Sequence, residues 1–336
     1  MALLGGQILN FADIQKRMDP KGMPAKIAEL LAQSTPIVND ILWKPSNLPT
    51  SHRSTIRTGL PTVNLRRLNQ GSAASKSTTA QIEDGMSLLD AWSHVDAKVL
   101  ELSGYPMQMR FGEGRSFIEA MGQKFENLFF YGDETDDDRE FNGLQPRYTS
   151  LGDNVLSAGG TGSELSSVYL VGWGDDKVFG IYPEHCAAGI KHKDHGERPW
   201  QESTDLGGSV LNAYVDQWCW DAGLVVKDHR YVVRIAEVDA TEVLDPAAPP
   251  QSLTDYTTNL LFLMAKAMHR IPNLQACRPV FYMPRTVFEG FDVQVLARTT
   301  ANVFATAQVD GQIVTTYRGI PIKVADQLGY AEGVLT

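Results

Sequence analysis

The sequence predicts an α+β fold, in which strands and helices do not alternate strictly. Three observations indicate this class. The chain has 336 residues, more than one hydrophobic core usually holds, so two or more lobes are expected. A long apolar helical pattern lies near the middle of the chain, at about 117–131. Segments rich in β-branched and aromatic residues, which are typical of strands, are concentrated in the second half.

The predicted helix at about 117–131 is the element against which we expect other segments to pack. Ser116 and Glu119 form a capping box, in which each side chain satisfies one free backbone N–H at a helix start. Gly132 suits the left-handed conformation that ends a helix. The apolar positions at helical spacing are Phe117, Ala120, Met121, Phe125, Leu128 and Phe129, and the residues expected to form the core of this spine helix are Phe117, Met121, Phe125, Leu128 and Phe129.

Residues 1–50 alternate short apolar groups with glycine and proline, which predicts an extended arm without a core of its own. One helix is expected at 25–32, because Pro24 suits a first turn and Ile27, Leu30 and Leu31 share a face. A loose tail is the alternative. The apolar residues between positions 30 and 43 favour an arm that docks.

Residues 51–86 are predicted to form an extended hairpin. Segments 55–58 and 62–66 alternate polar and apolar residues, as strands do, and 80–83 is the returning strand. Small residues at 70–79 mark the tip. Two polar strands without a core are marginal in isolation, so a disordered linker is the alternative.

A second capping box, Ser87 with Asp90, predicts another helix, followed by a strand-like segment at 107–111. A second lobe is expected from Ser163, with a turn at 174–176 between two strands of a hairpin and a buried helix at 260–268. The apolar positions of the helix after Ser87 are Leu88, Trp92, Val95, Val99 and Leu102. Further strands are predicted at 211–220, 224–235, 280–283, 303–309, 313–317 and 320–324.

The net charge of −10 is unevenly distributed. Residues 1–80 hold ten lysines and arginines against four acidic residues, a net +6, so the other 256 residues carry −16. A basic arm on an acidic body can bind nucleic acid, or it can reach the acidic body of an identical neighbour. The acidic bulk repels DNA, which favours self-assembly.

No catalytic, cofactor or metal site is predicted. His185, Cys186, His192 and His195 form the best metal candidate, but their spacing matches no common zinc site, and charged neighbours favour a solvated loop. The acidic loop at 133–138 lacks the glycine of a calcium loop. The glycine-rich run at 159–163 lacks the lysine of a phosphate-binding loop. A metal-dependent hydrolase using the His185–His195 loop remains the alternative function.

Three cysteines far apart argue against a disulfide framework, and no apolar run is long enough to span a membrane. The basic residues of the N-terminus follow its apolar residues, the reverse of a signal peptide. We therefore expect a soluble protein made in a reducing cytoplasm.

Four segments carry a resemblance to a known family. They are FFYGD at 129–133, EFNGLQPRY at 140–148, the run at 221–235, and RGIPI at 318–322. In their order and spacing the chain resembles the major capsid proteins of tailed bacteriophages, more closely those of short-tailed phages with the Hong Kong 97-like capsid fold. The resemblance extends from about Ser87 to the end of the chain.

The resemblance implies a division into five parts. These are an N-terminal arm (1–50), an extended hairpin called the E-loop (51–86), a peripheral domain containing the spine helix (87–162), an axial domain (163–310) and return strands (311–336). It also implies contacts of the E-loop and arm with a neighbouring subunit. The basic residues expected at that interface are Arg53, Arg57, Arg66, Arg67 and Lys76.

The implied function is structural rather than enzymatic. Hexamers and pentamers of the protein would close an icosahedral shell, assembled in the host bacterial cytoplasm and retained in the virion. The implied partners are other copies of the chain, a scaffolding protein, a portal and a cement or decoration protein. DNA would be contacted only non-specifically and no membrane would be involved. Some relatives form a Lys–Asn crosslink, for which Lys76 would be the donor, but no Asn or Glu can be assigned to it from sequence.

Overall fold

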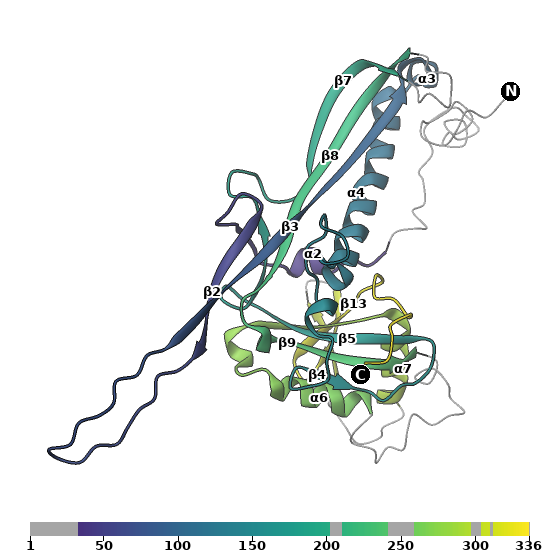
Figure 1. The fold of residues 1–336 in the computed structure, drawn as a ribbon. Helices are drawn as coiled ribbons and strands as arrows, with labels where there is room; N and C mark the ends of the chain where they lie inside the picture. Colours follow the sequence, from purple (N-terminus) through teal and green to yellow (C-terminus); the bar gives the residue numbers. More distant parts are fainter. Residues whose placement is uncertain (1–32, 202–209, 241–258, 297–303, 310–311, 336) are drawn as a thin grey trace. The chain divides into compact units, whose positions relative to one another are not determined.

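The structure is a computed structural model that describes residues 33–201, 210–240, 259–296, 304–309 and 312–335 (Figure 1). The helix expected at 25–32 lies outside these residues. The described residues fall into two compact units. Unit 1 comprises Gln33, 88–125 and 187–222, and unit 2 comprises 34–87, 126–186 and the chain from 223 onward. Three elements contribute residues to both units: β3 (Thr78–Asp96), α4 (Pro106–Tyr131) and β8 (Val210–Val226).

The core of unit 2 is built around strand β5 (Leu165–Trp173), all of whose residues are buried. It pairs antiparallel with β9 (Val232–Asp239) on one side and β10 (Arg278–Met283) on the other. A strand buried on both faces needs apolar residues at successive positions, and Val168, Tyr169, Leu170 and Val171 supply them. The sheet continues beyond β10 with β13 (Ile320–Val324), β12 (Gln312–Tyr317) and β11 (Phe304–Val309), and beyond β9 with β4 (Val155–Ser157).

Helix α6 (Leu260–Arg270) packs against β9 in this unit, and its N-terminus is capped by the Asn259 side chain. The predicted helix at 260–268 is therefore confirmed, as are the strands predicted at 280–283 and from 303 to 324. Unit 2 also contains β1 (Trp43–Pro45), β6 (Val178–Tyr182), the short helix α2 (Ile37–Asp40), α7 (Arg285–Leu296) and the 3-10 turns η1 (Gln145–Arg147), η3 (His229–Tyr231) and η4 (Leu274–Ala276).

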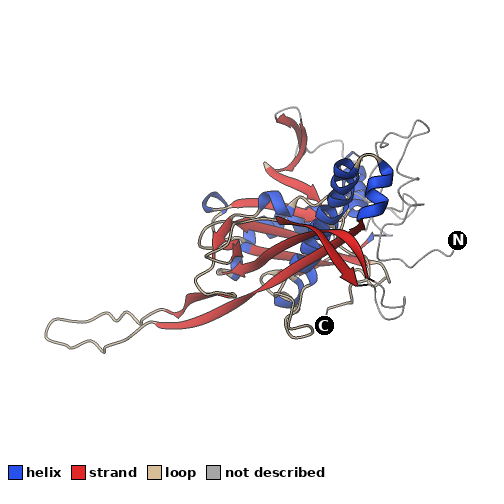
Figure 2. Ribbon diagram, turned by 90° about the horizontal axis from the view of Figure 1, so that it is seen from above, coloured by secondary structure: helices blue, strands red, loops and turns tan. Residues whose placement is uncertain are grey.

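A long antiparallel hairpin also belongs to unit 2. Strand β2 (Ser51–Gly59) pairs with the first part of β3 from Ser51 opposite Gly85 to Gly59 opposite Thr78. The residues between the strands, 60–77, form neither helix nor strand and project from the hairpin as a loop (Figure 2). The strand expected at 62–66 is thus wrong. Among the described residues, this segment pairs with no strand of the sheet.

Unit 1 consists of a helix on one face of a sheet. Strand β7 (Lys191–Gln201) pairs antiparallel with β8, and β3 lies on the other side of β8. The first part of α4 covers this sheet (Figure 1): Phe117 stacks on Trp218 with ring centroids 4.9 Å apart, and Phe125 contacts Trp220 at 4.5 Å. A smaller hydrophobic cluster in unit 1 lies near α3 (Ala97–Ser103) and consists of Val95, Leu100 and Met109.

The helix predicted after Ser87 is wrong, because this stretch is the second part of β3. Residues four apart share a face in a strand as well as in a helix, so Leu88 and Trp92 fit both patterns. The structure exposes both and buries Ser93 and Val95 on the opposite face, which is a strand alternation. The helix begins later, where the Asp96 side chain caps α3.

The spine helix begins about eleven residues earlier than predicted, at Pro106, which suits a first helical position. The strand expected at 107–111 is therefore wrong. Ser116 is not a cap, since its hydroxyl donates to the Glu113 carbonyl within the helix. Gly114 obscured the helical pattern. A Cβ there would lie 3.0 Å from Cζ2 of Trp218, so the close approach of helix and strand favours glycine, and a larger residue would have to displace the Trp218 ring by a few tenths of an ångström.

Two further strand predictions need correction. The strands predicted at 211–220 and 224–235 are divided at a different place. Residues 211–226 form one continuous strand, and the chain leaves it at η3, which the Asp228 side chain caps. The turn at 174–176 is present, with the Lys177 N–H donating to the Gly174 carbonyl at 3.1 Å. However, β5 and β6 share only the pair Trp173 and Val178 and then take different partners, so they do not form a hairpin ladder. The five-part domain division stays a prediction, and the units described above group residues differently from it.

Substituting Phe125 tests the burial of the spine helix. Its side chain is 0% exposed, so Phe125→Ala should lower the free energy of unfolding by about 3–5 kcal/mol through lost transfer energy and a cavity. Lys124→Ala, at the neighbouring exposed position, should change it by no more than about 0.5 kcal/mol. Chemical unfolding of unassembled subunits measures both. Equal stability of the two variants would contradict the burial of Phe125.

Glu126, also on α4, places its side chain in the interior of unit 2, where the residue is 0% exposed. Its pKa is raised to about 8, chiefly by burial and to a smaller extent by the nearby Asp326 carboxylate, while a hydrogen bond to the backbone of Ile37 acts in the opposite direction. Between its ordinary value of 4.5 and about 8, the folded chain holds a proton here that the unfolded chain has released. The free energy of unfolding therefore falls as pH rises through this range.

Glu126→Gln should remove this pH dependence. One pKa unit corresponds to about 1.36 kcal/mol, so the wild-type chain should lose a few kcal/mol between pH 5 and pH 9 relative to the variant. Urea unfolding of unassembled subunits at several pH values provides the measurement, with the wild type as reference. Parallel pH profiles for the two proteins would show that Glu126 does not titrate as described.

Candidate functional site

The tip of the hairpin, residues 60–77, is the most exposed apolar segment in the described chain. Few internal hydrogen bonds support it, among them Ser75 Oγ to the Thr62 carbonyl at 2.7 Å. Its large aliphatic side chains, with their exposed fractions, are Leu60 (80%), Val63 (89%), Leu65 (104%) and Leu68 (91%). Contiguous exposed apolar side chains mark surfaces that another molecule covers.

The five basic residues predicted for an interface all lie on this hairpin, and all are exposed. Arg53 is at its base, where it binds Glu83 across the two strands with an Nη2–Oε2 distance of 2.9 Å. Arg57, Arg66, Arg67 and Lys76 have no acidic partner among the described residues. The tip therefore combines uncovered aliphatic side chains with uncompensated positive charge.

The base of the hairpin is fixed by an ion pair that the sequence did not reveal. Asp84 lies on β3 at the base of the hairpin. It is buried and binds Arg147 Nη2 at 2.7 Å. Burial raises the pKa of Asp84, and the charge of Arg147 opposes this change. Arg147 also donates to the carbonyls of Asn142 and Gly143. The hairpin is thus anchored to the loop that follows α4.

That loop also ends the spine helix. The Gly143 N–H donates to the Gly132 carbonyl at 2.8 Å, and the Leu144 N–H donates to the Phe129 carbonyl at 2.9 Å. A Cβ on Gly143 would lie 2.6 Å from the Leu128 carbonyl oxygen, so only glycine fits. The EFNGLQPRY segment therefore satisfies the free carbonyls at the helix end and places Arg147 beside Asp84.

The spine-helix residues singled out in the sequence differ in burial. Met121, Phe125, Leu128 and Phe129 are buried, and Phe117 is half-buried against Trp218. Phe130, which the helical pattern did not single out, is fully buried, and its ring centroid lies 5.3 Å from that of Tyr169. The buried ion pair between Arg234 and Glu332, at 2.8 Å, could not be predicted from sequence because the two residues are far apart in the chain.

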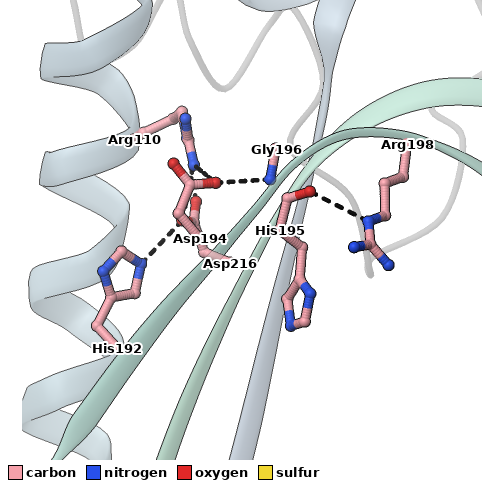
Figure 3. Close-up of polar contacts among 7 residues, drawn as sticks. All are labelled: Arg110, His192, Asp194, His195, Gly196, Arg198 and Asp216. Carbon is pink, nitrogen blue, oxygen red and sulfur yellow. Dashed lines mark hydrogen bonds and ion pairs between the residues drawn. The ribbon is translucent and has the colours of Figure 1, made fainter.

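The candidate metal ligands do not converge. His192 Nε2 lies 2.9 Å from Asp216 Oδ1, whereas His195 Nε2 bonds to the side chain of Gln217 and its ring stacks on Trp92. Figure 3 shows the two imidazoles pointing apart. Within the described ranges no group of three or more His, Cys, Asp or Glu side chains could hold a metal ion. The hydrolase alternative has no support from this geometry.

The polar contacts in Figure 3 instead join the helix of unit 1 to its sheet. Arg110 on α4 donates to both carboxylate oxygens of Asp216 on β8, at 3.1 and 2.7 Å, and binds Asp194 on β7 at 2.8 Å. The hydrogen bond from Arg110 lowers the pKa of the Asp194 carboxyl. Asp194 and Asp216 face each other across the strand pair, a register that the sequence alone does not reveal.

None of the described helices has both the length and the apolar character needed to cross a bilayer. The family model of the major capsid protein GP7 matches residues 19–336. A search of curated proteins finds no match.

Among solved structures, that of bacteriophage Epsilon15 aligns over 100% of both chains with a TM-score of 0.75 and 25% identity. The capsid of bacteriophage JBD30 aligns over 90% of this chain and 95% of its own, with a TM-score of 0.44 and 11% identity. An encapsulin complex from Synechococcus elongatus aligns over 71% and 96%, with a TM-score of 0.45 and 11% identity.

These findings confirm the family and the Hong Kong 97-like α+β fold that the sequence resemblance implied. The family match covers every residue that the structure describes, including the spine helix, the hairpin and the described parts of both units. The chain belongs to the GP7 family of major capsid proteins.

Proposed function

We propose that the chain is the repeating subunit of a phage head, and that the hairpin tip is a main contact between neighbouring subunits. Hexamers and pentamers of the chain would close an icosahedral shell around the double-stranded DNA genome. The observation that carries the proposal is the exposure of four aliphatic side chains on a tip with no partner within the described chain. The family supports a virion structural protein rather than an enzyme.

The energetics of the tip favour a protein partner. Burying one Val or Leu side chain contributes about 1.5–3 kcal/mol, so covering the tip of every subunit adds substantial stability to a shell. A nucleic-acid partner would be recognised by phosphate contacts and would leave the aliphatic side chains in water. The four leucine and valine side chains therefore indicate an apolar groove on another copy of the chain.

Positive charge on the tip would guide this contact. Residues 81–336 carry a net charge of −16, so Arg57 on β2 and Arg66, Arg67 and Lys76 on the tip are attracted to the acidic part of a neighbouring subunit. Exposed ion pairs contribute little to affinity but raise the rate of association and fix its orientation.

The finer parts of the role follow from membership of the family. We infer that a scaffolding protein guides closure, that a portal occupies one vertex and that a cement or decoration protein binds outside. Assembly would take place in the host bacterial cytoplasm. Packaged DNA would meet the shell only through non-specific contact, because the acidic body repels phosphate.

Replacing tip leucines tests the contact. Leu65→Asp with Leu68→Asp should leave the stability of unassembled subunits within about 0.5 kcal/mol of wild type, since both side chains are exposed. The same change should abolish closed shells, as judged by electron microscopy and sedimentation. Leu151→Asp, at an exposed leucine outside the hairpin, is the matched control and should assemble normally. Shells of normal size from the double variant would refute the role of the tip.

Reversing tip charge tests the steering. Arg66→Glu with Arg67→Glu should slow and weaken assembly most at low salt, because the Debye length falls to about 8 Å at physiological ionic strength. Lysine at both positions preserves the charge and should assemble at close to the wild-type rate. Light scattering across a salt series follows the reaction. A rate that depends on neither the variant nor the salt would exclude electrostatic guidance by these residues.

A further inference from the structure

The chain after β13 forms a strap, residues 325–335, which contains neither helix nor strand and belongs to unit 2. A segment without a ladder of its own depends on separate hydrogen bonds for its position. The backbone N–H groups of the strap donate to groups on β10, α4, β5 and β9 in turn. These bonds join Ala325 to the Met283 carbonyl, Gly329 to the Tyr131 hydroxyl, Glu332 to the Leu165 carbonyl and Leu335 to the Glu237 carboxylate.

An enclosed ion pair fixes the middle of the strap. Arg234 on β9 is 1% exposed, and its Nη2 lies 2.8 Å from Glu332 Oε2. Ser167 donates to the same carboxylate oxygen and accepts a hydrogen bond from Arg234 Nε at 2.9 Å. The other oxygen, Glu332 Oε1, accepts the Tyr131 hydroxyl at the end of α4, at 3.0 Å. Because a buried charge without its partner is strongly unfavourable, this pair keeps the strap on unit 2.

A residue with an unusual backbone conformation holds the far end of the strap. Glu237 on β9 has a φ of 60°, which is uncommon for a residue with a Cβ. Its carboxylate accepts the Leu335 N–H at 2.8 Å and the Ser157 hydroxyl. Backbone strain of this kind persists only where surrounding contacts maintain it, and the strap supplies one of these contacts.

The Arg234 guanidinium also reaches the loop that holds the hairpin. Its Nη1 donates to the Tyr148 carbonyl at 2.8 Å. The residue before Tyr148 is Arg147, whose ion pair with Asp84 fixes the base of the hairpin. One planar group makes the bonds to Ser167, Glu332 and Tyr148 together, so the loss of one partner disturbs the geometry of the others.

We propose that Glu332 is a positioning residue, and that the strap holds the hairpin base in place through Arg234. With the strap closed, Arg234 is oriented toward the Tyr148 carbonyl and the loop carries Arg147 to Asp84. With the strap open, Arg234 loses its carboxylate partner, and the hairpin base opens more often than unit 2 unfolds. Any effect on shell assembly rests on the proposed role of the tip, whereas the positioning of the hairpin base does not.

Amide hydrogen exchange in the full-length, unassembled subunit tests the proposal, under conditions in which exchange reports the opening equilibrium. Glu332→Gln removes the carboxylate charge and preserves the size of the side chain. Amides of the strap should exchange faster, which reports that the strap has opened. Amides of residues 51–59 and 78–86, at the hairpin base, should exchange at least about tenfold faster than in the matched control, a change of about 1.4 kcal/mol in opening free energy.

The matched control separates positioning from general stability. Val280→Ala removes a buried side chain of β10 that makes none of the bonds described above. Urea brings its overall stability to that of Glu332→Gln, as measured by chemical unfolding. At equal stability, a residue with only a structural role would leave the two variants with the same exchange at the hairpin base.

A milder variant keeps the test decisive if Glu332→Gln does not fold. Tyr131→Phe removes the hydroxyl that bonds to Glu332 and Gly329, and leaves the ion pair with Arg234 in place. Exchange in the strap and at the hairpin base should rise together, by about threefold.

Three results would overturn the proposal. The first is unchanged strap exchange in Glu332→Gln, since the ion pair would then not hold the strap. The second is faster strap exchange without faster exchange at the hairpin base, in either variant. The third is equal exchange at the hairpin base in Glu332→Gln and the matched Val280→Ala. None of these measurements requires shells, so they do not depend on whether the hairpin tip contacts a neighbouring subunit.

Discussion

Burial of the apolar stripe on α4 is the constraint on which the rest of the structure depends. The helix has 26 residues and is therefore about 39 Å long, more than one sheet layer of this chain covers. Different segments supply the partners in turn: Trp218 and Trp220 of β8 in unit 1, and Trp173 and Tyr169 of β5 in unit 2. Aromatic residues suit this task because each buries a large area with little side-chain entropy to lose. The helix thereby belongs to the core of each unit.

The end of this helix determines where the hairpin is held. Gly143 and Leu144 satisfy the last carbonyls of α4, and the same loop directs Arg147 to the buried Asp84 at the base of β3. A buried charge without its partner is strongly unfavourable, so this pair fixes the hairpin base firmly. The tip has no comparable contacts within the described chain. A fixed base with an adaptable tip limits the entropy lost on binding while allowing the tip to fit its partner.

Sequence patterns predicted the elements whose signals are local. The buried helix α6 and strands such as β10 and β13 were placed within a few residues, because a short apolar run has few other interpretations. The stretch after Ser87 was misread because Leu88 and Trp92 share a face in either structure. The start of α4 was missed because Gly114 looks like a break until Trp218 is seen beside it. At the candidate site, the exposed arginines of the hairpin could be named from charge. The anchors Arg147–Asp84 and Arg110–Asp216 could not, because each joins residues distant in the chain.

The two uncovered apolar surfaces present one physical problem with two different solutions. A subunit of a shell must expose the side chains that will later be buried, yet remain dispersed until assembly begins. At the hairpin tip, residues 60–77 form no strand edge that could template aggregation, and arginines between the leucines repel identical tips. On α4 the exposed side chains of Met107, Phe111 and Ile118 form an apolar stripe with paired charges beside it, so repulsion offers no such protection. That face therefore needs another molecule or another part of the protein to cover it.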